Sequence, residues 1–282
     1  MPRIPVVDLA GGPATAAAEI RRACEDVGFF TVVGHGVPEE TIDAISSSAR
    51  AFFDLPEDEK RRLAEPATAP GVPVYRPMGI EKLGSNADRK ESLDWGPSLA
   101  GVAWPDRPVE LRGAYERYFT ELLRLAGTLV QSFALALGLD EDALDASFDD
   151  RSSSVRVIDY PAGAGGARAG AHRDYGCLTI IRSDAGGLEA ETRAGEWLPV
   201  AAPPGGFVVN IGDLMQRWTG DRWVSTLHRV VGPEGASPRR QSLVFFHNPR
   251  AEAVIETLGG GVVYEPVRAG EYVLRRAAAA GL

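Results

Sequence analysis

SVRVIDY, residues 154–160, is the first of seven short apolar runs that decide the fold of this 282-residue chain. Each run is rich in β-branched, aromatic or other apolar residues, and glycine or proline turns separate it from the next. Strands this short at this spacing are typical of an all-β sandwich or barrel. We therefore predict strands over residues 155–160, 178–181, 187–190, 197–200, 207–211, 228–231 and 243–247.

Helical periodicity flanks these strands. Apolar residues at helical spacing predict a helix over residues 14–27, a second from about Pro38, and a long one from Leu111 that stops at Gly138. We expect Asp140 to cap a short helix, residues 212–213 to form a turn, and a C-terminal helix to begin at about Ala269. Short strands are predicted at 4–9 and 29–33, and loops with short strands over 64–108.

The expected fold class is thus mainly β with flanking helices. No linker is long or polar enough to separate domains, so we expect a single domain over residues 1–282. It would comprise a mainly helical N-terminal region (1–150), a β-core (151–250) and a C-terminal helical region (251–282).

Composition narrows the function. The chain is 44% apolar and 24% charged, with a net charge of −9 and no basic stripe, so we expect no nucleic-acid partner. No apolar run approaches the roughly 18 residues that span a bilayer, and no signal peptide is recognisable. The two cysteines form no disulfide framework or zinc motif. We expect a cytoplasmic protein with no obligate protein partner.

Three residues form a candidate metal site. His172 and Asp174 stand two positions apart at the start of a predicted strand, so their side chains would share a face. His228 lies in another strand-like segment, 56 positions later. Two imidazoles and one carboxylate leave open positions on an octahedral metal, which suits an Fe(II) oxygenase. A His-x-Asp pair alone is weak evidence, because a surface histidine beside a solvated aspartate gives the same pattern.

Companion residues strengthen the hypothesis. Arg240 and Ser242 share a strand face, and a guanidinium with a hydroxyl suits a carboxylate ligand. The alternative is a surface arginine paired in sequence with Arg239, which is out of phase with Ser242. The Tyr160 hydroxyl could bind the same carboxylate, although a half-buried strand tyrosine is nearly as good a reading.

With these residues in view, the chain resembles the isopenicillin N synthase-like branch of the 2-oxoglutarate/Fe(II)-dependent dioxygenases. The matching stretches keep the family's order over nearly the whole chain: IPVVDL, CEDVGFFTVVGHGVP, FFDLPEDEK, DYP, AHRDYGCLTII, GGLEAE, GEWLPV, PPGGFVVNIGDLMQRWTGDRWVSTLHRVV and RRQSLVFFHNP.

The resemblance implies a double-stranded β-helix (jelly-roll) core. It implies Fe(II) held by His172, Asp174 and His228, and 2-oxoglutarate held through its distal carboxylate by Arg240, Ser242 and Tyr160. With O₂ as oxidant, such an enzyme hydroxylates or desaturates a small molecule. Arg173 departs from the family, which commonly has a small polar residue there. We expect it to face solvent, with an acidic substrate group as the alternative partner.

The same resemblance suggests substrate-contacting residues from the segments that border the site in related enzymes: Tyr75, Arg76, Trp95, Gln216, Trp218 and Phe246. They favour a small polar or carboxylated substrate, such as an amino acid or a natural-product intermediate of specialised metabolism. We expect His35 to be structural and His247, whose strand phase opposes Ser242, not to bind metal.

Two other functions remain open at this point. One is a 2-oxoglutarate-independent Fe(II) oxidase of the isopenicillin N synthase type, in which Arg240 and Ser242 would bind a substrate carboxylate. The other is a non-catalytic binding protein on the same fold. The lack of cysteine ligands and of a His-Glu-x-x-His helix argues against a zinc hydrolase.

Overall fold

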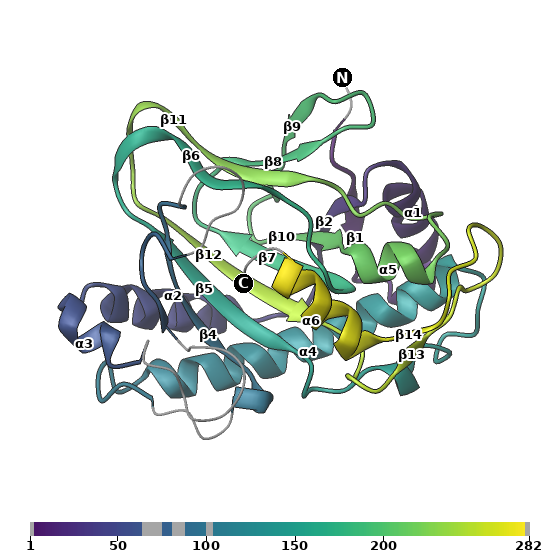
Figure 1. Cartoon of the computed structure of the whole chain (residues 1–282), viewed down its shortest axis with the longest axis horizontal. Coiled ribbons are helices and arrows are strands. Elements are labelled where there is room, and N and C mark those ends of the chain that lie inside the picture. The colour runs from purple at the N-terminus through teal and green to yellow at the C-terminus, as the bar shows by residue number, and fades with distance from the viewer. Residues whose placement is uncertain (1–2, 64–74, 81–87, 100–103, 280–282) are drawn as a thin grey trace.

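Two β-sheets face each other, and helices cover the outer side of the larger one (Figure 1). The computed structural model describes residues 3–63, 75–80, 88–99 and 104–279. Within these residues the larger sheet has eight strands, in the spatial order β1 (Val6–Asp8), β2 (Phe29–Val33), β10 (Phe207–Ile211), β7 (Leu178–Ser183), β12 (Arg240–His247), β5 (Ser154–Tyr160), β4 (Glu91–Trp95) and β3 (Tyr75–Arg76).

The smaller sheet lies above it in Figure 1. Its described strands run in the order β6 (Gly163–His172), β11 (His228–Ser237), β8 (Leu188–Glu191) and β9 (Trp197–Pro199). A separate ribbon pairs β13 (Val254–Ile255) with β14 (Val267–Arg268). All these pairings are antiparallel except that of β1 with β2. The expected fold class, mainly β with flanking helices around a jelly-roll core, is confirmed.

The two faces of the larger sheet pack against different partners. Leu243 and Phe245 of β12 belong to a hydrophobic cluster that also holds the buried residues of the helices. Val244, between them, belongs to a second cluster shared with Leu188 and Val230 of the smaller sheet. We call the helix-covered side the outer face and the side toward the smaller sheet the inner face, because alternation along each strand assigns every side chain to one of them.

The helices supply the outer layer. They are α1 (Pro13–Asp26), α2 (Glu39–Phe53), α3 (Glu57–Arg61), α4 (Leu111–Ala136), α5 (Asp213–Trp218) and α6 (Ala269–Ala279), with 3₁₀ turns at Pro97–Leu99 and Asp145–Ser147. The predicted long helix is α4, and Gly138 just beyond it has φ +78°, the left-handed conformation expected of a C-cap glycine. α1 and α2 both pack on α4. None of the helices among the described residues is long and apolar enough to cross a membrane.

Three local predictions were wrong. Asp140 caps no α-helix: turns follow it, and the 3₁₀ turn begins after Leu144 without a side-chain cap. Asp213 does not end in a turn but begins α5, because Leu214, Met215 and Trp218 bury one side of a short helix.

The third difference concerns β6. We expected a strand to begin at His172, but His172 is the last residue of β6. The sequence of this strand, GAGGARAGAH, lacks β-branched residues, so its extended form depends on pairing with β11 rather than on local preference. Register shifts interrupt that pairing at several points, as expected of β-bulges.

Candidate metal centre and co-substrate site

The three predicted metal ligands lie together between the sheets. His172 ends β6, His228 begins β11, and the two are direct partners in the β6–β11 pairing. Asp174 follows in the loop between β6 and β7. Its Oδ1 is 4.0 Å from His172 Nε2 and 3.8 Å from His228 Nε2, and one ligand atom from each residue lies within 4.8 Å of the others. The convergence was predicted correctly, although Asp174 lies in a loop and not on the same strand face as His172.

Main-chain oxygens orient both imidazoles. The Nδ1 atom of His172 is 2.9 Å from Gly170 O, and that of His228 is 3.1 Å from Thr226 O. A carbonyl oxygen only accepts, so each Nδ1 carries the proton and donates it, which leaves the Nε2 lone pair toward Asp174. Burial and the neighbouring His228 outweigh the attraction of Asp174 and lower the pKa of His172 to about 4. The ring is therefore neutral at physiological pH, as a metal ligand must be.

Two side chains hold the other oxygen of Asp174. Thr179 Oγ1 donates to Oδ2 at 2.6 Å, and Asn210 Nδ2 donates to the same atom at 2.7 Å. Burial alone would raise the pKa of Asp174, but the two histidines and these two donors lower it overall, so the carboxylate stays ionised. With Oδ2 engaged, Oδ1 is the oxygen that faces the histidines. Sequence reasoning missed both donors, although each is a polar residue inside an apolar strand.

The loop that carries Asp174 is fixed by main-chain contacts with the start of α5. Asp213 N donates to Asp174 O at 2.8 Å, and Leu214 N donates to Gly176 O at 3.1 Å. A Cβ atom on Gly212 would lie only 2.4 Å from Gly176 O, so a glycine is needed there. Gly212, which precedes α5, thus helps to position a candidate metal ligand.

The residues fit an Fe(II) centre. Two imidazoles and one ionised carboxylate form a donor set of the two-histidine, one-carboxylate type, with each ligand supported by a hydrogen bond behind it. Three ligands leave the remaining positions of an octahedral ion for a co-substrate and O₂.

A buried guanidinium lies beside Tyr160. Arg240 is 1% exposed and pairs directly with Tyr160 across β12 and β5, with its Cζ 5.0 Å from the tyrosine ring. Its Nη1 donates to Ser242 Oγ at 2.6 Å, and its Nε donates to the main-chain oxygens of Ala185 and Gly186. Within the described part of the chain, no carboxylate pairs with it.

A buried cation with only neutral partners is costly unless an anion joins it. The grouping of Arg240, Ser242 and Tyr160 therefore fits the carboxylate of a bound ligand. Arg239, the sequence neighbour, instead pairs with Asp54 and Asp159.

The six residues named as substrate contacts divide between the two faces. Arg76 pairs with Ser92 and lies on the inner face, as does Phe246, which packs against the inner cluster. Tyr75 is fully buried on the outer face and donates a hydrogen bond to Glu91.

The remaining three make other contacts. Trp95 packs on Trp104 and Phe119 in the outer cluster. Trp218 is 4% exposed in that cluster, and Gln216 of α5 bonds Asp221 and Ser225 N.

Sequence reasoning named Arg76 but missed two charged residues that pair beside it on the inner face, Asp94 and Arg156. Arg156 donates from Nε and Nη2 to the two oxygens of Asp94 at 2.8 and 2.9 Å, and Arg76 contacts the same carboxylate. We call Arg76, Asp94 and Arg156 the inner-face ion cluster. Its only sequence signal was the alternation within SVRVI and ESLDW, which becomes informative once β4 and β5 are known to pair.

The remaining histidines and Arg173 lie apart from this group. His35 has Nε2 2.6 Å from Gly205 O, and its Nδ1 accepts from Val37 N, so it ties a turn together. His247 stacks on Phe148 with its Nδ1 2.8 Å from Ser153 Oγ, on the outer face. Arg173 is exposed, as expected, but it follows β6 instead of lying on a strand, and its Nε donates to Ser225 O at 2.8 Å.

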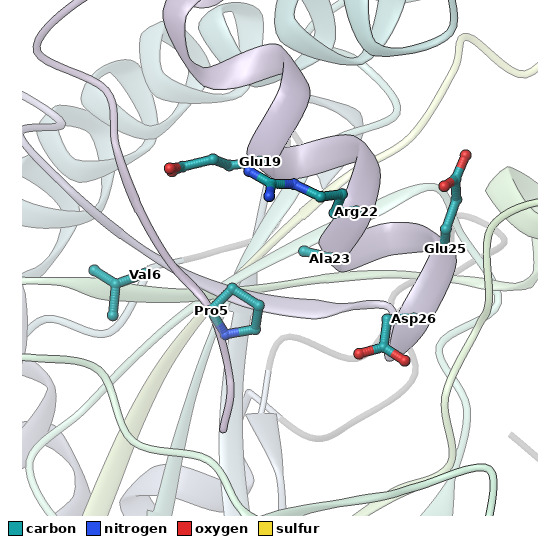
Figure 2. Close-up of a pocket in the computed structure, with 7 residues that line it drawn as sticks. All are labelled: Pro5, Val6, Glu19, Arg22, Ala23, Glu25 and Asp26. Atoms are coloured by element: carbon teal, nitrogen blue, oxygen red, sulfur yellow. The ribbon is translucent and has the colours of Figure 1, made fainter. Parts of the chain in front are cut away.

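A surface cleft lies elsewhere, between α1 and the residues entering β1. Figure 2 shows its lining, which is Pro5, Val6, Glu19, Arg22, Ala23, Glu25 and Asp26. None of the candidate metal or carboxylate-binding residues borders it.

Comparison with known proteins agrees with this geometry. Residues 4–115 match the N-terminal model of the non-haem dioxygenases in morphine synthesis, and residues 152–249 match the 2OG-Fe(II) oxygenase superfamily. The chain belongs to the 2-oxoglutarate/Fe(II)-dependent oxygenases. This family uses Fe(II), 2-oxoglutarate and O₂, and the protein is accordingly an oxidoreductase that acts on small molecules.

Three proteins illustrate the relationship. A homoarginine-6-hydroxylase of Arabidopsis thaliana is 31% identical over 88% of this chain and 73% of its own length. The validamycin A dioxygenase of Streptomyces hygroscopicus subsp. limoneus is 30% identical over 97% of this chain and 85% of its own. The crystal structure of JOX2 in complex with 2OG, Fe and JA superposes with a TM-score of 0.81 at 29% identity, covering 96% of this chain and 84% of that one.

Proposed function

We propose that this oxygenase oxidises a small, charged substrate carrying a carboxylate, such as an amino acid or a carboxylated natural-product intermediate. In this proposal His172, Asp174 and His228 hold Fe(II), and Arg240, Ser242 and Tyr160 hold the distal carboxylate of 2-oxoglutarate. Bound Fe(II) supplies dioxygen activation coupled to the oxidative decarboxylation of 2-oxoglutarate. The chain itself orients both substrates and keeps water away from them.

The observation that carries the substrate class is the position of the inner-face ion cluster. Asn210, Thr179 and Phe246 are successive partners across β10, β7 and β12, so they form one row on the inner face. Two of these residues donate hydrogen bonds to Asp174, so Phe246 lies in the same row as the residues that hold this proposed ligand. The Arg156 guanidinium lies 5.7 Å from the Phe246 ring.

A further ion pair extends the charged surface toward His172. Asp88 and Lys90 are both buried, and Lys90 Nζ lies 3.0 Å from Asp88 Oδ2. Asp88 Oδ1 also accepts a hydrogen bond from Gly170 N, two residues before His172. Between this pair and the ion cluster, the hydroxyl of Ser92 is buried and has no hydrogen-bond partner among the residues that the structure describes.

Such a surface selects charged substrates. Arginines bind carboxylates through paired N–H donors, and aspartates bind ammonium or guanidinium groups. A substrate that carries both signs, as amino acids do, would complement Arg76, Asp94 and Arg156 together. The homoarginine hydroxylase among the relatives acts on a molecule of this kind. Of the six residues named from the sequence, this proposal keeps Arg76 and Phe246 and leaves out Tyr75, Trp95, Gln216 and Trp218.

A paired-substrate screen tests the proposal. The Fe(II)-loaded enzyme is offered amino acids and other carboxylic acids, each beside its carboxamide, and succinate, O₂ consumption and product mass are measured. We expect acids to be oxidised with one succinate per product and carboxamides to react poorly. Gain of an oxygen atom indicates hydroxylation, and loss of two hydrogens indicates desaturation.

Variants locate the selectivity. Arg156→Gln should raise the KM for the best acid by about 10-fold or more, while the KM for the co-substrate should stay the same. Arg124→Gln is the control, because Arg124 is 71% exposed on α4. Equal turnover of acids and carboxamides, or an unchanged KM in Arg156→Gln, would refute the substrate class. Product formed without succinate would instead indicate an oxidase that does not use 2-oxoglutarate.

We also infer that the enzyme works in the cytoplasm, as one domain and without nucleic acid, membrane or obligate protein partners. The net charge of −9 supports the absence of nucleic acid. Cys24 and Cys177 are both buried and unpaired, as in proteins of reducing compartments. A single outer cluster joins residues from α1, α4, the larger sheet and the segment after residue 250, which supports one domain.

A further inference from the structure

A second buried arginine lies next to Arg240. Arg168 of β6 is 6% exposed, and its Cζ is 5.9 Å from the centre of the Tyr160 ring. The Cζ of Arg240 is 5.0 Å from the same ring. Two guanidiniums from different sheets therefore meet at one tyrosine, the residue proposed to help hold the distal carboxylate of 2-oxoglutarate.

Arg168 has neutral partners only. Its Nη2 donates to Ser237 Oγ at 2.5 Å and also contacts Pro238 O. Within the described residues no carboxylate forms an ion pair with Arg168. Asp159 is near enough to interact with it electrostatically, but Asp159 is paired with Arg239. Burial and the nearby Arg240 lower the pKa of Arg168 below its ordinary value, although an arginine remains charged.

The backbone is shaped to bring this side chain inward. Val230 pairs with Ala169, but the next residue, Val231, pairs with Ala167, so Arg168 is the extra residue of a bulge in β6. Bulges redirect side chains and are frequent beside active sites. Opposite it, a Cβ on Gly232 would lie 3.2 Å from Arg168 Nε and 2.7 Å from Ser237 Oγ. A glycine at that position leaves room for the guanidinium.

Two like charges buried side by side destabilise a protein unless an anion neutralises them. Tyr160, whose ring lies near both guanidiniums, has a hydroxyl that makes no hydrogen bond with the described residues, and Ser242 already supports Arg240. We propose that Arg168 is a second guanidinium for the distal carboxylate of 2-oxoglutarate, so that Arg168 and Arg240 bind it from opposite sheets. This inference rests on the proposed role of Arg240.

The proposal makes Arg168 a specificity residue for the co-substrate. A 2-oxo acid whose far end is neutral would gain nothing from the second charge. The Arg-x-Ser pair on β12 would still recognise one carboxylate, but the affinity and its salt dependence would depend on both arginines.

Binding of 2-oxoglutarate to the Fe(II)-loaded protein without O₂ tests this, by calorimetry and without any oxidisable substrate. Arg168→Met, which keeps the length and removes the charge, should raise the Kd by about 10- to 100-fold. It should also reduce the preference for 2-oxoglutarate over 2-oxopentanoate and weaken the salt dependence of binding. Arg168→Lys should recover part of the affinity.

Ser237→Ala separates binding from a structural role, because it removes a partner of Arg168 but keeps the charge. We expect its Kd for 2-oxoglutarate to remain within about twofold of the wild-type value. An unchanged Kd in Arg168→Met, or an equal loss in Ser237→Ala, would overturn the proposal. If Arg168→Met does not fold, Arg168→Lys and Ser237→Ala still decide. A binding role predicts that Arg168→Lys changes the preference for 2-oxoglutarate over 2-oxopentanoate and that Ser237→Ala does not.

If Arg240→Met keeps wild-type affinity, the assignment of the whole co-substrate site fails, and not only that of Arg168. The two failures are therefore distinguishable.

Discussion

The two faces of β12 have different surroundings, although the side chains alternate between them residue by residue. Leu243, Phe245 and His247 face the helices, where Phe245 meets the Phe119 ring of α4 at 5.5 Å. Ser242, Val244 and Phe246 face the smaller sheet, in a layer that also contains the metal centre and buried charges. The apolar cluster on the outer face is large, whereas the inner apolar cluster is small and its polar neighbours hydrogen-bond one another.

This difference indicates that the outer face mainly stabilises the fold, whereas the inner face carries the binding residues. Burial of apolar area on the outer face is the main source of folding free energy. On the inner face, polar groups are held in place by partners of their own, so a substitution there should change binding more than it changes folding. A substitution on the outer face should therefore mainly lower stability, whereas one on the inner face should mainly weaken binding. Three experiments test this difference.

The largest effect is expected from the histidines. His228→Ala removes a proposed metal ligand on the inner side and should abolish Fe(II) binding and iron-dependent O₂ uptake, measured by metal analysis and an oxygen electrode. His247→Asn is the matched control, because His247 lies on the outer face against Phe148. It should retain bound iron and O₂ uptake. Retained iron-dependent uptake in His228→Ala would refute the ligand assignment.

Neighbouring phenylalanines give the next effect. Phe245→Ala should lower the free energy of unfolding by about 3–5 kcal/mol, because Phe245 is fully buried in the outer cluster. Phe246→Ala, one residue away, should cost about 1–2 kcal/mol but raise the KM for the oxidisable substrate. Urea unfolding and steady-state kinetics measure the two. Equal losses of stability from both variants would contradict the separation of the two faces.

The smallest effect concerns Thr179, whose hydroxyl holds Asp174 Oδ2. Thr179→Val keeps the shape of the side chain and removes the hydrogen bond, so Fe(II) affinity should fall by about 10- to 100-fold. Thr179→Ser restores the hydroxyl and should bind iron nearly as the wild type does. Competition with a chelator measures both. An Fe(II) affinity that is the same in Thr179→Val and the wild type would show that the second oxygen needs no such support.

Much of this arrangement was predictable from the sequence. Period-two alternation along residues 240–247 correctly separated Ser242 from His247, and helical periodicity located α1, α2 and α4. The prediction that His172, Asp174 and His228 lie together followed from residue type and spacing, together with family resemblance.

The rest depended on contacts between distant segments. β6 has a glycine- and alanine-rich sequence and is extended only because β11 pairs with it. Tyr75 and Trp95 were assigned to the site, but the register of β3 and β4 turns them toward the helices and turns Arg76 and Asp94 inward. Arg168 went unnoticed because a bulge, which single-sequence periodicity does not reveal, sets its direction.

The main-chain hold on Asp174 has a consequence for how such an enzyme can evolve. Gly176 and Gly212 leave no space for a side chain, since a Cβ on Gly176 would lie 1.8 Å from Asn248 Oδ1 and one on Gly212 would lie 2.4 Å from Gly176 O. Few substitutions can therefore be tolerated in the loop that carries Asp174. The ion cluster on β3, β4 and β5 consists of side chains on other strands, which can be exchanged while that loop stays as it is. Proteins that diverge from this chain can thus acquire new substrates while the proposed metal-binding residues stay the same.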